Sequence, residues 1–250
     1  MNLYVVGLMW VIGIALLAGG LAYLVRKIGA TEGVVENNEA AGQVFTLVGG
    51  MQAVLLAFVL ISLFDGVSAA EDGSYQEADS LVAAVWSAKA LQATDVAPEA
   101  RAYVREVIDQ EWPRMQAGEP VSDAGWDSLA KLRTAVAKSP ATDDWTNNQK
   151  TEAATQLWQV YQARQDRLNA ASDDGVNSVV WFSLVVGAVM AVALPILFGG
   201  PKPRTHVFIV SILAATMTML LFSTQQLQNP YGGGAQVGPA AFQSALDRLR

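Results

Sequence analysis

The chain has 250 residues, of which 52% are hydrophobic and 16% are charged, and its formal net charge is −7. Soluble proteins carry roughly 25% charged residues, so this composition indicates membrane-spanning segments. The absence of cysteine excludes disulfides and thiolate chemistry, and a single histidine, His206 at a predicted membrane edge, gives almost no material for a metal site. We therefore predict no cofactor and no metal site, and we predict no nucleic-acid partner because no basic face is visible.

Residues 3–25 form the first uninterrupted apolar run, which is long enough to cross a bilayer and lacks the basic start of a signal peptide. A second charge-free run covers residues 44–64. It carries a stripe of small residues suited to helix packing: Gly42, Thr46, Gly49, Gly50, Ala53 and Ala57. A second stripe, offset around the helix, contains Gln52, Leu56, Val59 and Leu63. For the amide of Gln52 we favour an interhelical hydrogen bond over a role in a pore.

The second run is followed by acidic residues without any nearby base, beginning with Asp65, Glu71 and Asp72. Ser74 and Glu77 have the spacing of a capping box, which predicts that a new helix starts there. Residues 66–175 then read as about four amphipathic helices, with Pro113 expected to kink or end the second. Acid pairs at residues 71–72, 143–144 and 173–174 are interpreted as helix caps rather than Ca²⁺ ligands.

Two further apolar runs, residues 176–198 and 207–222, flank a short basic loop that contains Lys202 and Arg204. Residues 227–250 form a turn-rich segment and a short helix. Strand alternation is not visible anywhere in the sequence. We therefore predict an all-α integral membrane protein with an extramembrane helical domain inserted between transmembrane helices 2 and 3. The expected divisions are residues 1–65, 66–175, 176–226 and 227–250.

Lys and Arg residues in short loops predict the orientation, because they are retained on the cytoplasmic side. The short loops carry Arg26, Lys27, Lys202 and Arg204, whereas the acidic segment after the second run has none; only Arg164 and Arg167 argue the other way. The expected location is a bacterial plasma membrane with the acidic domain outside the cytoplasm.

Several motifs in order resemble a family of bacterial integral membrane proteins grouped as bestrophin-like. The matching positions include Phe45–Gly49, Leu56–Val59, Glu77, Tyr103, Glu111, Trp112, Pro113, Arg164, Arg167 and the Asn229–Gly233 turn with Pro230 and Gly232. Bestrophins share the predicted layout and are pentameric anion channels whose second membrane helix lines an apolar neck. The resemblance implies that Gln52, Leu56, Val59 and Leu63 line a pore. Acids at its mouth (Asp65, Glu71 and Asp72) would repel chloride, which favours a cation pathway or a different vestibule.

Two functions stay open at this point. The first is a homo-oligomeric channel in the lipid bilayer, built on the second membrane helix. The second is a membrane-anchored subunit whose acidic helical domain docks a partner protein. A pore-lining helix should expose a face that no other helix of its own chain covers, whereas an anchoring bundle should bury both stripes. An enzyme is not predicted, because no nucleophile motif or phosphate-binding glycine loop accompanies the acids.

Overall fold

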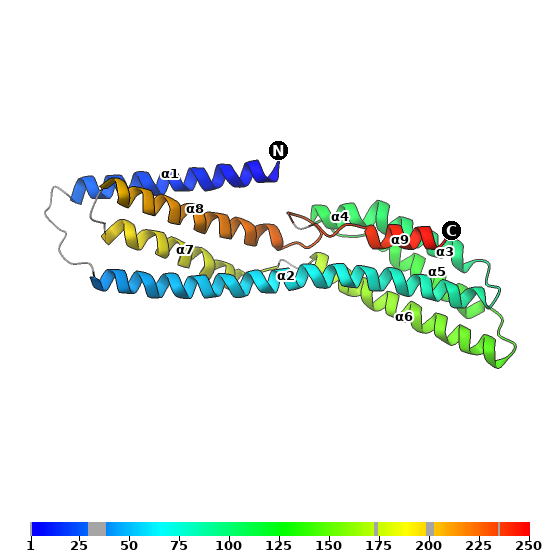
Figure 1. Ribbon diagram of the computed structural model, residues 1–250. Helices are drawn as coiled ribbons and strands as arrows, with labels where there is room; N and C mark the ends of the chain where they lie inside the picture. Colours follow the sequence, from blue (N-terminus) through cyan, green and yellow to red (C-terminus); the bar gives the residue numbers. More distant parts are fainter. Residues whose placement is uncertain (1, 30–38, 173–174, 199–202, 235) are drawn as a thin grey trace. The chain divides into compact units, whose positions relative to one another are not determined.

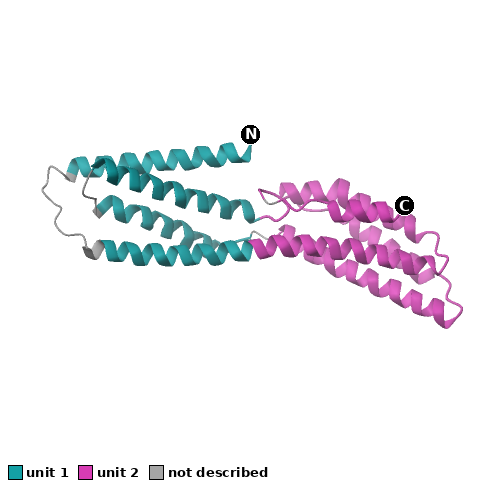
Figure 2. Cartoon of the chain, viewed as in Figure 1, with its two compact units in different colours: residues 1–63, 175–228 teal, residues 64–174, 229–250 magenta. Residues whose placement is uncertain are grey.

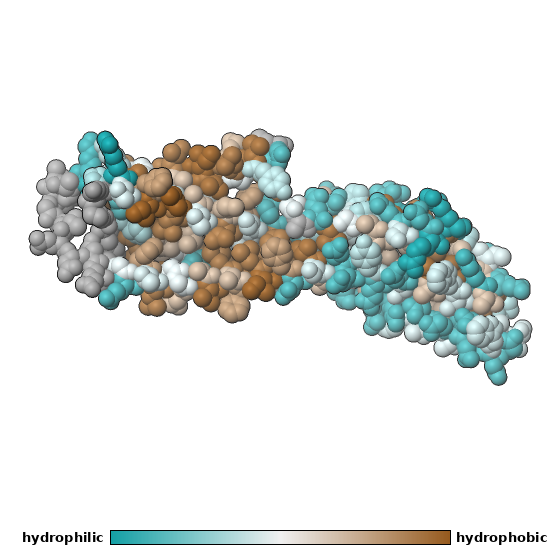
Figure 3. All heavy atoms as spheres, in the orientation of Figure 1, coloured by the Kyte–Doolittle hydropathy of each residue, from teal (hydrophilic) through white to brown (hydrophobic). Residues whose placement is uncertain are grey.

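The computed structural model describes residues 2–29, 39–172, 175–198, 203–234 and 236–250, and every regular element in these ranges is helical (Figure 1). Residues 30–38, between the first two predicted membrane runs, lie outside the described residues, as do Lys202 and the acid pair Asp173 and Asp174. The chain forms two compact units (Figure 2). Unit 1 comprises residues 1–63 and 175–228, and unit 2 comprises residues 64–174 and 229–250. On the face seen in Figure 3, apolar residues predominate on unit 1 and hydrophilic residues predominate on unit 2.

Unit 1 contains α1 (Leu3–Gly29), the first half of α2 (Glu39–Lys89), α7 (Ser178–Phe198) and α8 (Pro203–Leu227). All four are long and apolar enough to cross a membrane, which confirms the four predicted spans. Helices α1 and α8 lie side by side (Figure 1), and the small side chains of Ala18 and Ala22 pack there on Val210 and Ala214. Small residues allow this close approach, which is how membrane helices associate when lipid is as apolar as the helix surface.

Unit 2 contains the second half of α2, α3 (Val96–Glu106), α4 (Trp112–Ala117), α5 (Ala124–Lys138), α6 (Asp144–Ser172) and α9 (Ala240–Arg248). Its apolar core includes the buried side chains of Leu81, Trp112, Leu157 and Phe242. The predicted cap of α6 is confirmed, because Asp143 Oδ1 accepts a hydrogen bond from the Thr146 N–H at 2.7 Å. That hydrogen bond also lowers the pKa of Asp143.

Helix α2 differs from the sequence prediction, because it continues through the expected break at Ser74 as a single helix from Glu39 to Lys89. The Ser74 hydroxyl donates to the carbonyl of Ala70 at 2.7 Å, one turn back, and does not cap a new helix. Glu71 and Asp72 accordingly lie inside α2 and not at a helix start. The buried positions Leu56, Ala70 and Ser74 belong to one continuous stripe, and this continuous stripe explains why the local capping pattern is overridden.

The C-terminal segment is part of the helical domain rather than a separate region. Asn229 Oδ1 accepts hydrogen bonds from the backbone N–H groups of Tyr231 and Gly232, and its Nδ2 donates to Met115 O at 3.2 Å. At the end of the chain, Arg101 donates to Leu249 O at 2.8 Å. These contacts fix the predicted turn and short helix onto unit 2.

Candidate functional site

The face of α2 that carries Gln52 is covered by α7 within unit 1. The Gln52 side chain is 5% exposed, and its Nε2 donates to the Leu184 carbonyl at 2.9 Å. Leu56, on the same stripe, is 2% exposed. Gly187 of α7 provides the space for this contact, because a Cβ at that position would overlap the Gln52 amide. The favoured interpretation of Gln52 as the donor of an interhelical hydrogen bond agrees with this geometry.

This burial argues against a pore-lining role for Gln52 and Leu56, whereas that role stays a prediction for Val59 and Leu63. Gln52 and Leu56 are buried by their own chain, and Val59 and Leu63 are half-buried on the same stripe. A pore-lining side chain must remain uncovered in its own subunit, since it faces water. This stripe instead packs α2 against the membrane bundle, through the hydrogen bond from Gln52 to α7.

The stripe of small residues on α2 has no packing partner within the described residues. Gly42, Thr46, Gly50, Ala53 and Ala57 are exposed and Gly49 is half-buried. A Cβ built on Gly42, Gly49 or Gly50 would meet no other atom within 4 Å. No described residue of this chain fills the predicted packing role, which stays a prediction for contacts with other chains.

The side of α2 opposite Gln52 is also uncovered. Leu47 is 66% exposed, Val54 56% and Ile61 57%, and their seven-residue spacing places them in one row along the helix. An open apolar concavity runs beside them along α2, with Thr46, Gly50 and Phe58 in its lining. Helix α2 thus meets one requirement of a pore-lining helix, a continuous face that no other described helix of its chain covers.

The three predicted pore-mouth acids, Asp65, Glu71 and Asp72, are all exposed on α2. Asp65 and Asp72 are seven residues apart and share one side of the helix, whereas Glu71 lies about a quarter of a turn away from Asp72. Their role at a pore mouth stays a prediction.

Unit 2 contains a buried ion network that joins α2, α6 and the helical turn before α4. Arg164 binds Glu111 through two hydrogen bonds of 2.7 and 2.8 Å. Arg167 donates to Glu77 from Nε at 2.8 Å and to Glu111 from an Nη at 2.9 Å. All four side chains are fully buried. Two positive and two negative charges therefore neutralise each other, which offsets the large cost of removing each from water.

Aromatic side chains surround this network. The Tyr103 hydroxyl donates to Glu77, and the Arg164 guanidinium lies 4.6 Å from the Trp126 ring centroid. Arg167 lies 5.7 Å from the Trp112 ring centroid. The pKa of Tyr103 is raised well above its usual value, first by burial and then by the carboxylate of Glu77. The pKa of Glu111 is lowered, because hydrogen bonds and charge from both arginines outweigh the effect of its burial.

Local backbone geometry places Glu111 in the network. Residues Val107–Glu111 form a π-helical turn, so the helix from Val96 continues through the predicted break at Pro113 as far as Ala117. Such a turn shifts the following side chains around the axis, and π-helical turns are frequent at functional sites. Gly125 is equally necessary, because a Cβ there would overlap both the Glu111 carboxylate and the Arg164 guanidinium.

The sequence motifs named above for their resemblance meet in this part of the fold, except Phe45–Gly49 and Leu56–Val59, which lie in unit 1. Glu77, Glu111, Arg164 and Arg167 form the network itself. Trp112 donates from Nε1 to Val237 O at 3.2 Å and packs edge-on against Tyr231 at 5.4 Å between ring centroids. The sequence analysis did not predict the ion pairs. The one indication was that all four residues belong to the motifs that resemble the bestrophin-like family.

The network holds α2, α6 and the turn before α4 together, and its carboxylates are engaged in ion pairs. Each carboxylate is held by arginine, which leaves neither group available as a general base or metal ligand. In the described part of the chain, no three His, Asp or Glu side chains are grouped to hold a metal ion.

Comparison with known proteins gives the same picture of the fold. A crystal structure of a point mutant of a bacterial bestrophin homologue from Klebsiella pneumoniae has a TM-score of 0.75 at 12% identity, covering 96% of this chain and 97% of that chain. A crystal structure of a point mutant described as a membrane protein has a TM-score of 0.74, also at 12% identity and with the same coverage. No curated protein matches. The model of the bestrophin-like domain matches residues 12–242, and the chain therefore belongs to the bestrophin-like family.

Proposed function

We propose that this protein is a homo-oligomeric membrane channel whose pore is lined by the uncovered face of α2. The observation that supports this most directly is the row of Leu47, Val54 and Ile61, which lies opposite the Gln52 stripe and which no other described helix of the chain covers. Membership of the bestrophin-like family supports a channel fold. An anchoring bundle would instead be expected to bury both stripes of α2, whereas Gly42, Gly50 and Ala53 of the small-residue stripe are exposed.

In this arrangement the three faces of α2 have different roles. The Gln52 stripe attaches the helix to α7 of its own chain. The small residues Gly42, Gly49 and Ala53 lie about a quarter of a turn from Gln52 and permit close approach of α2 from an adjacent copy. The third face, with Leu47, Val54 and Ile61, is then directed to the central axis as an apolar neck. Asp65, one helical turn beyond Ile61, and Asp72, two turns further on, follow on the same side of α2.

The test uses the absence of native cysteine. Purified protein in nanodiscs should have a mass that is a multiple of 26.6 kDa per chain, and the protein in liposomes should conduct ions. Val54→Cys should conduct until a charged thiosulfonate reagent reacts with it. Phe182→Cys on α7, where the native side chain is 67% exposed, is the control and should be insensitive to the reagent. A single-chain mass, or equal insensitivity of both variants, would contradict the proposal.

A further inference from the structure

The outer face of α6 in unit 2 has a composition that differs from the rest of this acidic domain. Its exposed uncharged polar residues are amides and threonines: Asn147, Asn148, Thr151, Thr155, Gln162, Gln165 and Asn169. Between Asn147 and Asn169 the only exposed charged side chains are Glu152 and Asp166. Lys150, in the same stretch, donates from Nζ to Ala137 O and Ser139 O, so its charge serves the end of α5. A solvent-exposed helix of this length normally carries charges of both signs.

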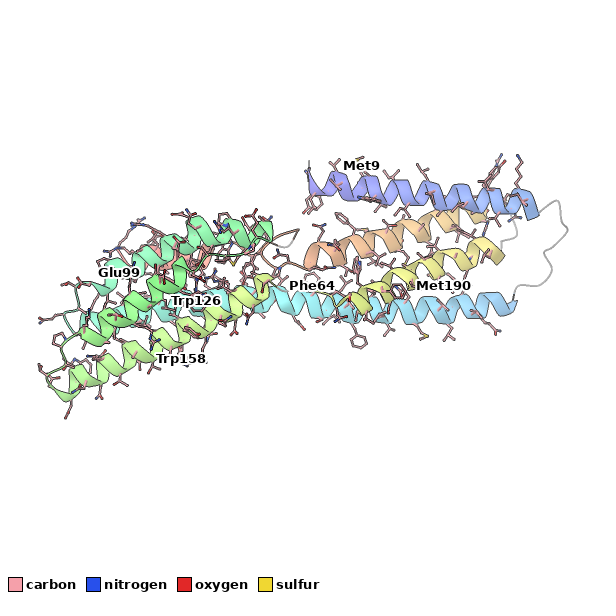
Figure 4. All side chains as sticks on the ribbon, turned by 180° about the vertical axis from the view of Figure 1, so that it is seen from behind. Met9, Phe64, Glu99, Trp126, Trp158 and Met190 are labelled. Atoms are coloured by element: carbon pink, nitrogen blue, oxygen red, sulfur yellow. The ribbon has the colours of Figure 1, made fainter. Side chains whose placement is uncertain are left out.

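Trp158 lies in the middle of this face and is 54% exposed (Figure 4). Its ring stacks on Tyr161, with 5.1 Å between centroids and an angle of 5° between planes. Tyr161 in turn contacts Trp126, whose ring covers the buried Arg164 guanidinium. The exposed indole is therefore supported by a stack of rings that ends at the ion network. A large aromatic side chain held in this way on a surface depleted of charge is typical of the centre of a protein interface.

A groove beside Trp158 adds a second feature of an interface. It lies between α2 and α6 and is lined by Gln76, Gln162 and Gln165 as well as by Trp158 and Tyr161. Amide side chains both donate and accept hydrogen bonds, so the groove can bind side chains that are hydrogen-bond donors and side chains that are acceptors. The groove carries one charge, from Asp166.

The net charge of the helical domain indicates which partner binds the outer face of α6. Residues 65–175 contain 19 acidic and 10 basic residues, so two copies of this domain repel each other through most of their surfaces. Contact between copies is favoured at a face with few acids, and the outer face of α6 exposes only two between Asn147 and Asn169, Glu152 and Asp166. A basic partner protein would instead be drawn to the acidic surface of α2, where Glu71 and Asp72 are exposed.

We infer that the outer face of α6, centred on Trp158, is the surface through which the helical domain contacts the same domain of an adjacent copy of this chain. This inference rests on the proposed homo-oligomer and adds to it the place where the extramembrane domains meet. The amides and threonines supply hydrogen bonds without charge mismatch, and Trp158 supplies the apolar contact.

The experiment places the photoreactive amino acid benzoylphenylalanine at Trp158 of the full chain, and separately at Gln162, in membranes. Illumination should give a covalent product of twice the chain mass from either position. Thr134 is the control position, because it is exposed on α5 of the same unit and is not part of the α6 face. This control position should give no such product.

The mass of the purified protein in nanodiscs separates failure of this inference from failure of the proposed function. A multiple of the chain mass without cross-linking at Trp158 and Gln162 would overturn the α6 contact and leave the oligomer intact. A single-chain mass would overturn both. A cross-linked product of any other mass would show that a different protein binds α6, and cross-linking at Thr134 as strong as at Trp158 would also refute the assignment.

Discussion

Gly125→Ala tests whether the ion network of unit 2 stabilises the fold, because it adds a single methyl group at the point of closest packing. The new Cβ would overlap the carboxylate of Glu111 and the guanidinium of Arg164. Both groups are fully buried and lie beside Trp126, so neither has free space into which to move. We expect the two hydrogen bonds between Arg164 and Glu111 to be lost or lengthened.

Two opposing effects determine how far Gly125→Ala changes the free energy of unfolding. Alanine is favoured over glycine inside a helix by about 1 kcal/mol, which would stabilise α5. Breaking a buried ion pair costs about 3–5 kcal/mol, because the separated charges stay out of water. The second effect is larger, so Gly125→Ala should lower the free energy of unfolding by about 2–4 kcal/mol. For a chain of this size that corresponds to a fall in Tm of roughly 4–16 °C.

The assay is thermal unfolding in detergent, followed by far-ultraviolet circular dichroism at one fixed scan rate. Gly73→Ala is the matched control, since Gly73 lies inside α2 in the same unit and a Cβ there meets no atom within 4 Å. The control should unfold at the wild-type temperature or slightly above it. If Gly125→Ala were as stable as Gly73→Ala, the network would tolerate displacement and its assigned contribution would be wrong.

Three other predictions follow from the contacts described above. Gly187→Ala should displace the Gln52 amide and lower the Tm of the protein, whereas Gln52→Leu, which removes one interhelical hydrogen bond, should cost only about 1 kcal/mol in unfolding experiments. The pKa of Glu111 is lowered in the folded state, so the stabilisation from the ionised carboxylate is complete at any pH above the unfolded-state pKa of this group. That stabilisation is lost as the pH falls towards the folded-state pKa. In denaturant titrations, Glu111→Gln should therefore lose less stability in acid than the wild type does. Gly73→Cys should react with a membrane-impermeant maleimide in intact cells, and protection until lysis would reverse the proposed orientation.

The membrane spans were predictable because their signal is local. A run of about twenty apolar residues is sufficient to cross a bilayer, and the hydropathy of α1, α2, α7 and α8 identifies each without knowledge of the others. The direction in which each stripe of α2 faces was not predictable in this way. Lipid, a neighbouring helix and an apolar pore all accept the same side chains, so Leu56 and Val54 look alike in sequence although one is buried and the other exposed.

The ion network was not predictable because its partners are far apart in the chain. Glu111 is 53 residues from Arg164, and Glu77 is 90 residues from Arg167. An arginine on an amphipathic helix is most often exposed, and nothing beside Arg164 or Arg167 in the sequence marks the carboxylate that each will meet. Gly125 gave no signal either, since its role depends on two side chains contributed by other elements.

The burial of two arginines does not change the argument about orientation. Arg164 and Arg167 were the basic residues that opposed placing the acidic domain outside the cytoplasm. Both are fully buried and paired with carboxylates, so they present no net positive charge to the membrane surface. The positive-inside rule counts basic residues in short loops and near the membrane ends, whatever carboxylates pair with them in the folded protein, so Arg164 and Arg167 stay in the count. The four basic residues of the short loops (Arg26, Lys27, Lys202 and Arg204) outnumber these two, and for that reason we expect the domain to lie outside the cytoplasm.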